Sequence, residues 1–238
     1  RITVHTGTQV RKTEGFVGNF RTTLSDDTLI NHGAIILATG GTEYEPTEYL
    51  SSESDKVITQ RELEKRIASG GKFNPGAGFV MIQCVGSREE PNQYCSRICC
   101  QDAVKNAIAI KEQNPDSQVI ILYRDIRTYG LREDYYKKAR DIGVLFIRYD
   151  VDKKPAVSKE GDKIKVIVWD YMLNKELIIH ADWLALSTGL RPHPTTEGTG
   201  KMYKVTRNQD GYFLEAHVKL RPVDFPSEGI FVCGLAHA

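Results

Sequence analysis

The stretch FVMIQCVGSREEPNQYCSRICCQDAVKNAIAI, residues 79–110, decides the fold of this 238-residue chain. It begins with an apolar run, 79–84, that is typical of a buried strand, and it ends in a helical pattern that starts at Cys99. A strand, a glycine-containing turn and a helix form the opening of a dinucleotide-binding unit. Here the turn contains a single glycine, Gly86. Because a pyrophosphate needs a Gly-x-Gly-x-x-Gly loop, we expect that this turn does not bind NAD(P).

The segments that follow alternate between strand and helix patterns. Residues 118–125 indicate a strand, 132–143 a helix and 144–150 a third strand. This β-α-β-α-β order predicts a parallel sheet with right-handed crossovers. Residues 163–189 predict a β-hairpin that leads into a further strand. The predicted fold class is therefore α/β: a Rossmann-like, dinucleotide-binding domain with a parallel sheet and an added β-hairpin layer.

Four of the five cysteines fall between residues 84 and 100, with the spacing C-x10-C-x3-C-C. One tight group in a large α/β chain indicates metal binding or redox chemistry in a reducing compartment. Cys84 ends the first strand, whereas Cys95, Cys99 and Cys100 lie in a loop and at a helix start, where the helix dipole stabilises thiolates. Four converging thiolates suit a [4Fe–4S] cluster or a tetrahedral Zn²⁺ ion, and the adjacent pair favours the wider cluster. A disulfide pair and inert core thiols are the alternatives.

Overall composition excludes two classes of partner. The net charge of +1 provides no electrostatic case for nucleic acid or an anionic membrane. No apolar run approaches the ~20 residues that are needed to span a bilayer. The chain begins at Arg1 without a methionine, so we expect it to be an internal piece of a longer protein, whose targeting signals lie elsewhere.

Four further residues, Arg88, Arg97, Asp125 and Cys233, could have a functional or an ordinary structural role. Arg88 and Arg97 either add positive charge beside the cysteines or form a solvated surface. Asp125 ends the second strand, where a dinucleotide-binding domain keeps its ribose-binding acid, but turn and helix-cap aspartates are common there as well. Cys233 lies in a short apolar run and is expected to be a buried strand residue.

Two apolar strands end in Thr-Gly, one on each side of the central block. Such ends are common in glycine turns, and they also let a ligand approach the backbone closely. The order of elements resembles flavoproteins of the thioredoxin-reductase type, in which an inserted NAD(P)-domain-like unit splits an FAD domain. The resemblance implies a partial FAD-domain segment at 1–50, an inserted domain with the cysteines at 51–190, and a return segment at 191–238. It places Thr39, Gly40, Gly41, Thr188, Gly189 and Gly234 at the cofactors.

Within the insert, the runs QCVGSRE, YCSRICCQDAVKNA, YRDIRTYG and GVLFIRY resemble the A subunit of heterodisulfide reductases. That family consists of cytoplasmic iron–sulfur flavoproteins that relay electrons between FAD and [4Fe–4S] centres. The resemblance implies other subunits and iron–sulfur electron donors or acceptors as partners, and no nucleic acid or membrane span. It places a [4Fe–4S] centre on the four clustered cysteines, Cys84, Cys95, Cys99 and Cys100.

The resemblance also places Lys105 near the flavin ring, with Glu62 as a second candidate. The plainer interpretations are an exposed helix lysine and a helix-capping glutamate that pairs with Thr59. The chain lacks the family's FAD-binding Gly-x-Gly-x-x-Gly finger. We therefore expect FAD in the full-length parent, and we expect this chain alone to be inactive.

Two other functions are compatible with the residues. The first is a non-catalytic docking module that a Zn²⁺ ion or a cluster stabilises. The second is an NAD(P)H-dependent flavin disulfide reductase, whose redox pair should read C-x-x-C or C-x4-C. C-x-x-C does not occur, and the C-x4-C spacing occurs only between Cys95 and Cys100, within the run of four cysteines.

Overall fold

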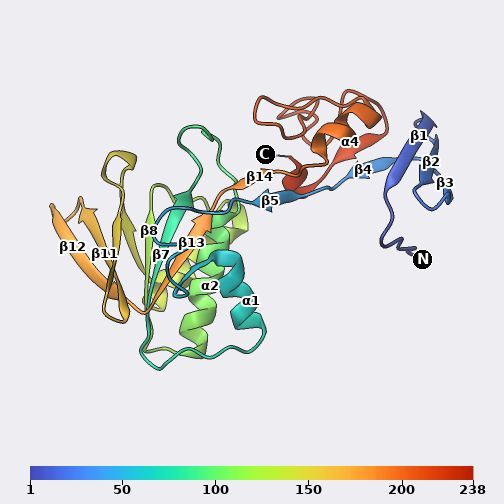
Figure 1. The fold of residues 1–238 in the computed structure, drawn as a ribbon. Helices are drawn as coiled ribbons and strands as arrows, with labels where there is room; N and C mark the ends of the chain where they lie inside the picture. Colours follow the sequence, from blue (N-terminus) through green and yellow to red (C-terminus); the bar gives the residue numbers. More distant parts are fainter. Residues whose placement is uncertain (238) are drawn as a thin grey trace. The chain divides into compact units, whose positions relative to one another are not determined.

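The computed structural model describes residues 1–237, which form two compact units. One unit consists of Arg1–Thr42 and the return segment that starts at Arg191, and the other consists of Glu43–Leu190. Figure 1 shows the elements of each unit, and each is described by itself. The cysteine-rich stretch belongs to the larger unit, Glu43–Leu190.

A five-stranded parallel sheet forms the centre of the larger unit. Its three inner strands are almost continuous runs of buried residues, as expected for a sheet that is covered on both faces. The predicted parallel sheet with helical crossovers is confirmed. In spatial order the strands are β6 (Val57–Thr59), β13 (Trp183–Thr188), β7 (Gly78–Val85), β8 (Gln118–Tyr123) and β9 (Leu145–Arg148).

Helices cover one face of this sheet, as Figure 1 shows for α1 and α2. Phe79 and Met81 of β7 are buried in the same apolar core as Ala103 and Ala107 of α2. The alanines leave room for the strand's larger side chains, and burying a side chain such as Phe79 stabilises the fold by about 1.5–3 kcal/mol. The helices are α1 (Gln60–Ala68), α2 (Cys99–Gln113) and α3 (Glu133–Asp141).

An antiparallel three-stranded layer covers the other face. Its strands are β10 (Ala156–Glu160), β11 (Lys163–Asp170) and β12 (Lys175–Ala181). Alternate residues of β11 are buried and share a core with the neighbouring face of β7. The predicted hairpin layer is confirmed. The sequence does not predict β10, because this edge strand is mostly exposed and lacks an alternation of apolar residues.

The predicted start of α1 is confirmed in atomic detail. Thr59 Oγ1 accepts a hydrogen bond from the Glu62 backbone N–H at 3.2 Å, and Glu62 Oε2 accepts one from the Thr59 backbone N–H at 2.7 Å. This capping box satisfies two N–H groups that a helix start would otherwise leave unpaired. The short strand β6 leads directly into it and is too short for a sequence pattern.

The smaller unit combines segments from both ends of the chain. The meander β1 (Val10–Phe16), β2 (Asn19–Leu24) and β3 (Leu29–His32) precedes β4 (Ile35–Leu37), which pairs in parallel with β15 (Ile230–Val232). The helix α4 (Thr196–Tyr203) and the 3₁₀ turn η3 (Gly234–Ala236) also belong to this unit. Where the chain passes between the units, β5 (Gly41–Glu43) pairs with β14 (Leu190–Pro192). Phe20, Phe213 and Phe225 lie in the core of the smaller unit.

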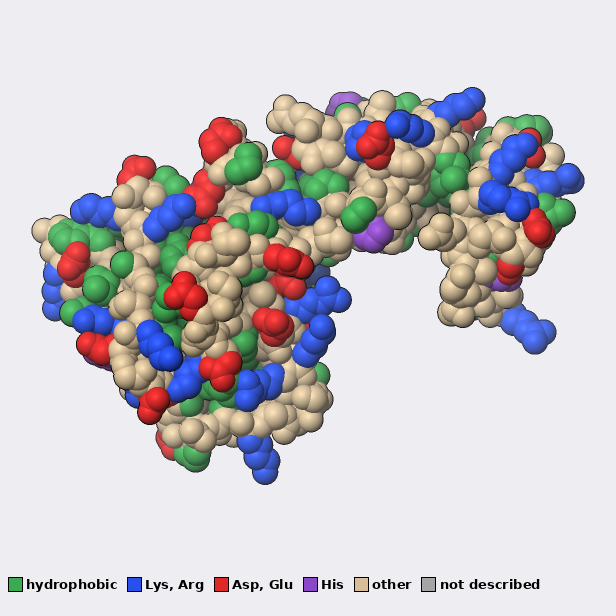
Figure 2. Space-filling model, viewed as in Figure 1, with side chains coloured by type: hydrophobic (Ala, Val, Ile, Leu, Met, Phe, Trp, Pro, Cys, Tyr) green, Lys and Arg blue, Asp and Glu red, His purple; other side chains and the backbone are tan. Residues whose placement is uncertain are grey.

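The surface charges of the larger unit are mixed. Figure 2 shows Lys and Arg side chains interspersed with Asp and Glu over the visible face of that unit. This distribution agrees with the net charge of +1. The visible face therefore does not carry the continuous basic stripe that a nucleic-acid backbone would require.

Candidate functional site: the four-cysteine segment

The four clustered cysteines lie at the carboxyl edge of the parallel sheet. Cys84 is the last but one residue of β7, Cys99 and Cys100 begin α2, and Cys95 lies in the loop between them. Open α/β sheets bind ligands at this edge, and dinucleotide-binding domains place the pyrophosphate at the turn after their first strand. The thiols therefore take the place of a phosphate-binding loop.

The backbone of this segment is irregular where it carries the cysteines. The pairing of β7 with β13 shifts register between Ile82 and Val85, so Cys84 lies in a β-bulge. Cys84, Arg88 and Arg97 all have left-handed φ angles, of 63°, 61° and 63°. Each such non-glycine residue costs on the order of 1–3 kcal/mol and persists where the surrounding contacts hold it, often at a functional site. The bulge redirects the Cys84 side chain away from the regular strand alternation.

Each clustered thiol contacts a backbone or side-chain group of the segment or of a neighbouring strand end. The Cys99 thiol donates to the carbonyl oxygen of Thr188 at 3.4 Å, and the Cys100 thiol donates to that of Asp125 at 3.6 Å. Cys84 Sγ accepts from Arg88 Nη1 at 3.9 Å. Similarly, Cys95 Sγ accepts from the backbone N–H of Arg97 at 3.4 Å. The ends of β8 and β13 thus contribute to the site, and all five cysteines of the chain are free thiols.

The thiols raise one another's pKa. Burial, followed by the charges of Cys100, Cys84 and Cys95, raises the pKa of Cys99 far above its ordinary range. Burial likewise raises the pKa of Cys100 to about 11 and also raises that of Cys84, although Arg88 opposes the shift at Cys84. Without a metal these three thiols are therefore protonated near neutral pH, and metal loading must release their protons.

The four sulfur donors fit an iron–sulfur cluster in their chemistry. Within residues 1–237, no three His, Cys, Asp or Glu side chains come close enough together to hold one metal ion. A cubane cluster is wider than one ion and separates its four thiolate ligands. The thiol donors and the guanidinium of Arg88, which donates to Cys84 Sγ, match the chemistry that an anionic cluster needs.

Thr188 and Gly189 lie directly beside the cysteines. Thr188 Oγ1 donates to Glu43 Oε1 at 2.7 Å, and the Gly189 backbone N–H donates to the Val85 carbonyl oxygen at 2.8 Å. The backbone N–H of Tyr44 in turn donates to the Gly189 carbonyl oxygen at 2.8 Å. Sequence reasoning missed Glu43 and Tyr44, because no pattern in the chain pairs them with residues 145 positions away.

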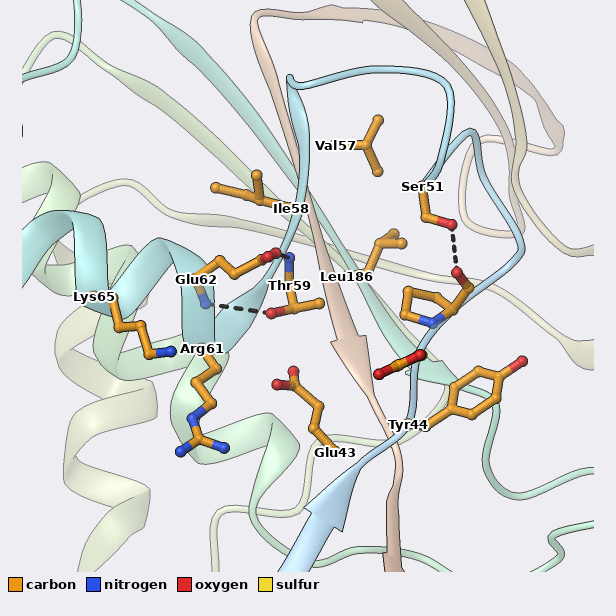
Figure 3. Close-up of a pocket in the computed structure, with 12 residues that line it drawn as sticks. Glu43, Tyr44, Ser51, Val57, Ile58, Thr59, Arg61, Glu62, Lys65 and Leu186 are labelled. Atoms are coloured by element: carbon orange, nitrogen blue, oxygen red, sulfur yellow. Dashed lines mark hydrogen bonds between the residues drawn. The ribbon is translucent and has the colours of Figure 1, made fainter.

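A cavity of about 420 Å³ opens next to these residues. Figure 3 shows Glu43 from β5 and Arg61 from α1 on the same side of it as the Thr59–Glu62 capping box. Val57 and Leu186 add apolar surface, and acidic and basic groups both line the opening. Its position at the carboxyl ends of β6 and β13 is one at which α/β sheets bind polar ligands.

A smaller cavity of about 230 Å³ reaches Cys84 itself. Val85 and Tyr149, which line it, belong to the core on the hairpin-layer face of the sheet. Arg124 also lines this cavity, and it donates to the carbonyl oxygens of Ser87 and Arg88. Solvent can therefore approach Cys84 from this face, whereas Cys99 and Cys100 begin α2 on the other.

Four further predicted cofactor residues, Thr39, Gly40, Gly41 and Gly234, belong to the smaller unit. Thr39 Oγ1 is buried and has no hydrogen-bond partner within the described part of the chain. Gly40 and Gly234 have φ angles of 72° and 65°, and no atom lies within 4 Å of where a Cβ would be. Gly41 follows as the first residue of β5. An orphaned buried hydroxyl beside open glycine backbone fits the close approach of a ligand such as FAD.

Lys105 and Glu62 are engaged on the protein itself. Lys105 Nζ pairs with Glu64 Oε1 at 2.6 Å, with its side chain about half exposed, and also lines a cavity of about 290 Å³ with Asp102 and Tyr135. Glu62 forms the capping box of α1. The plainer interpretation of Glu62 is confirmed, while a role of Lys105 beside a flavin stays a prediction.

Three other predictions are resolved by contacts or by exposure. Asp125 pairs with Arg88 at 2.5 Å, so it is an ion-pair acid rather than a helix cap. Arg97 is exposed, as a solvated residue would be. The expectation for Cys233 was wrong: β15 ends at Val232, and Cys233 is exposed. Val232 is buried. Because successive side chains of an extended backbone point to opposite faces, the Cys233 side chain points to solvent.

Comparisons with known proteins identify the fold first. No protein-family model matches the chain. Thioredoxin reductases of T. acidophilum and Lactococcus lactis superimpose on it with TM-scores of 0.54 and 0.52 and are 16% and 17% identical in sequence. The matches cover 98% and 96% of this chain and 66% and 65% of those structures. The predicted thioredoxin-reductase type of fold is confirmed.

Sequence comparison finds relatives among heterodisulfide reductase A subunits. The chain is 38% identical over 221 residues to the A subunit of the ferredoxin/F420H2-dependent CoB-CoM heterodisulfide reductase of Methanosarcina acetivorans. It is 40% identical over 224 residues to the iron-sulfur A subunit of the CoB–CoM heterodisulfide reductase of Methanocaldococcus jannaschii. The chain is homologous to a part of the heterodisulfide reductase A subunit.

These alignments cover 86% of this chain but only 28% and 34% of the two heterodisulfide reductase A subunits. The chain thus spans about a third of the length of its relatives, and the resemblance predicted from its cysteine-rich motifs is confirmed. Within the described residues, no helix combines the length and the apolar character needed to cross a membrane.

Proposed function

We propose that this chain is part of a heterodisulfide reductase A-like oxidoreductase, and that it carries a [4Fe–4S] centre that exchanges electrons with the flavin of the complete subunit. The observation that carries the proposal is the gathering of four free thiols at the sheet edge, in place of a phosphate-binding loop. The homology to proteins whose names include "iron-sulfur" supports it.

The chain's own residues divide the work of the proposed centre. Cys84, Cys95, Cys99 and Cys100 would hold the cluster, which supplies reversible electron storage when bound. Cys84 and Cys100 are both buried, and of the two only Cys84 lines the cavity of about 230 Å³ from which solvent can approach it. Arg88, which donates to Cys84 Sγ, offsets part of the negative charge that four thiolates bring.

The flavin belongs to the proposal for the complete subunit. Thr39, Gly40, Gly41 and Gly234 of the smaller unit would let the backbone approach FAD. Thr188 and Gly189 of the larger unit remain predicted cofactor-binding residues. Lys105 would place a cation near the flavin ring, where positive charge stabilises the reduced anionic form. A cytoplasmic complex with other subunits and with iron–sulfur electron donors or acceptors would complete the electron route.

Iron loading tests the proposal directly. We expect the chain, purified without oxygen and reconstituted with iron and sulfide, to bind about four iron atoms and to absorb near ~400 nm. Reduction with dithionite should then give an EPR signal. Elemental analysis of the purified chain separates this proposal from the docking module. Zinc in place of iron would favour a docking module. The absence of both metals would overturn the proposal.

Nicotinamide binding provides a second test. We expect NADH not to quench the fluorescence of Trp169 and Trp183 saturably, with any Kd weaker than about 1 mM, because the first βα turn contains Gly86 but no Gly-x-Gly-x-x-Gly loop. Free N-acetyltryptophanamide, titrated in parallel, corrects for absorption by NADH. Saturable quenching at micromolar NADH would instead support an NAD(P)H-dependent reductase.

A further inference from the structure

An arginine and an aspartate connect the two sides of the four-cysteine site. Arg88 donates from Nη2 to Asp125 Oδ2 at 2.5 Å, and from Nη1 to Cys84 Sγ at 3.9 Å. Asp125 lies 37 residues farther along the chain, just after β8, and its carbonyl oxygen accepts the Cys100 thiol at 3.6 Å. The contacts therefore run from the sulfur of Cys84 through Arg88 and Asp125 to the sulfur of Cys100.

The main chain of Arg88 is held on both sides. Its backbone N–H donates to the Tyr94 carbonyl oxygen at 3.1 Å, and its own carbonyl oxygen accepts from Arg124. Its φ of 61° turns the side chain into the site, where only 18% of it is exposed. A guanidinium is planar, so pairing one edge with Asp125 fixes the direction of the edge that faces Cys84. The arginine therefore presents its charge to the sulfur in one orientation.

The carboxylate of Asp125 is occupied by cations. Besides Arg88, Arg127 Nη2 lies 3.7 Å from the same oxygen, Oδ2. The bond from Arg88 is the main cause that holds the pKa of Asp125 below its ordinary value. An acid at this strand end binds ribose hydroxyls in dinucleotide-binding domains. In this chain the carboxylate at that position is paired with Arg88, and the backbone of the same residue accepts the Cys100 thiol.

We propose that Arg88, held by Asp125, is a positioning residue of the four-cysteine site that presents a fixed positive charge to Cys84 and favours the reduced form of a cluster bound there. This inference rests on the proposed function. A positive charge near the cluster stabilises the extra electron of the reduced state, and partial burial keeps solvent from screening it. Asp125 contributes by orientation and not by its charge, which acts in the opposite direction.

The test measures the ratio of reduced to oxidised cluster by EPR at a fixed potential, in the 238-residue chain reconstituted without oxygen. We expect Arg88→Gln to lower this ratio about tenfold, which for a one-electron couple equals about 59 mV. Arg97→Gln is the matched control, because it removes the same charge from an exposed position of the same loop. We expect it to change the ratio by less than about threefold, since solvent screens exposed charge.

A double variant separates orientation from charge. If Asp125 orients Arg88, then Arg88→Gln should change the ratio by less than about threefold when Asp125→Asn is already present. A full tenfold effect in that background, or equal effects of Arg88→Gln and Arg97→Gln, would overturn the inference and leave the proposed function intact. Failure of the wild-type chain to bind iron would overturn both. If Arg88→Gln takes up no iron, Arg88→Lys replaces it, because lysine keeps the charge but loses the planar fork. We expect Arg88→Lys to lower the ratio of reduced to oxidised cluster by more than Arg97→Gln does.

Discussion

Changing Cys99 to serine is expected to lower iron incorporation from about four atoms per chain to fewer than about one. The Cys99 thiol donates to the Thr188 carbonyl oxygen, and a serine hydroxyl can make the same bond, so the metal-free fold should persist. Oxygen is a harder ligand than sulfur, however, and iron–sulfur centres select soft thiolates. Iron and sulfide assays, together with EPR after reduction, measure the loss.

The control for this change is Cys233→Ser. Cys233 is exposed in the other compact unit, after β15, and the proposal gives it no role. We expect this variant to bind the wild-type amount of iron. Wild-type iron content and an unchanged EPR signal in Cys99→Ser would show that Cys99 is not a ligand, and the four-cysteine assignment would then fail. Circular dichroism of both metal-free variants checks that neither substitution unfolds the chain.

The sequence predicts the elements that have long, regular patterns. β7 and β8 contain continuous runs of several apolar residues, and α2 extends over about four helical turns. These patterns are therefore clear in the sequence. The alternation in β11 likewise reveals the hairpin layer. Short elements such as β6 and α4 are not predicted, because three strand residues or about two helical turns cannot show a period and their pairing or packing partners stabilise them.

The contacts of the candidate site are harder to predict than its residues. The cysteine spacing alone indicates Cys84, Cys95, Cys99 and Cys100, because thiols in one tight group have few other uses in an α/β chain. The partners of these thiols come from strand ends far along the chain, at Asp125 and Thr188. Such pairings follow from the order of strands in the sheet, which local patterns do not contain.

The bonds between charged and polar side chains are the least predictable part. Arg88 and Asp125 each have an ordinary solvated interpretation in the sequence, and only the meeting of two loops turns them into an ion pair. The same applies to Glu43 and Thr188. A local sequence pattern therefore identifies which chemistry a segment can carry, while the tertiary fold decides which charges tune that chemistry.

Gly86 is expected to be the most sensitive non-ligand position of the cysteine segment. Its φ of 66° costs an alanine on the order of 1–2 kcal/mol. A Cβ at this position would also overlap the ring of Tyr44, and crowding of this kind typically adds about 1–3 kcal/mol. Gly86→Ala should therefore lower the melting temperature of the metal-free larger unit by on the order of 10 °C. Because the shift acts two residues after Cys84, iron uptake should fall as well.

Two variants separate the overlap from the backbone strain. Gly143→Ala is the matched control: Gly143 has a φ of 86°, but no atom lies within 4 Å of its would-be Cβ, so only the strain of about 1–2 kcal/mol applies. Removing the ring with Tyr44→Ala should reduce the further cost of Gly86→Ala to about that same value. Thermal unfolding followed by circular dichroism measures both differences. Equal destabilisation by Gly86→Ala and Gly143→Ala would mean that Tyr44 does not pack against the turn as described. The contacts that connect Tyr44 through Gly189 to the cysteine segment would then be unsupported.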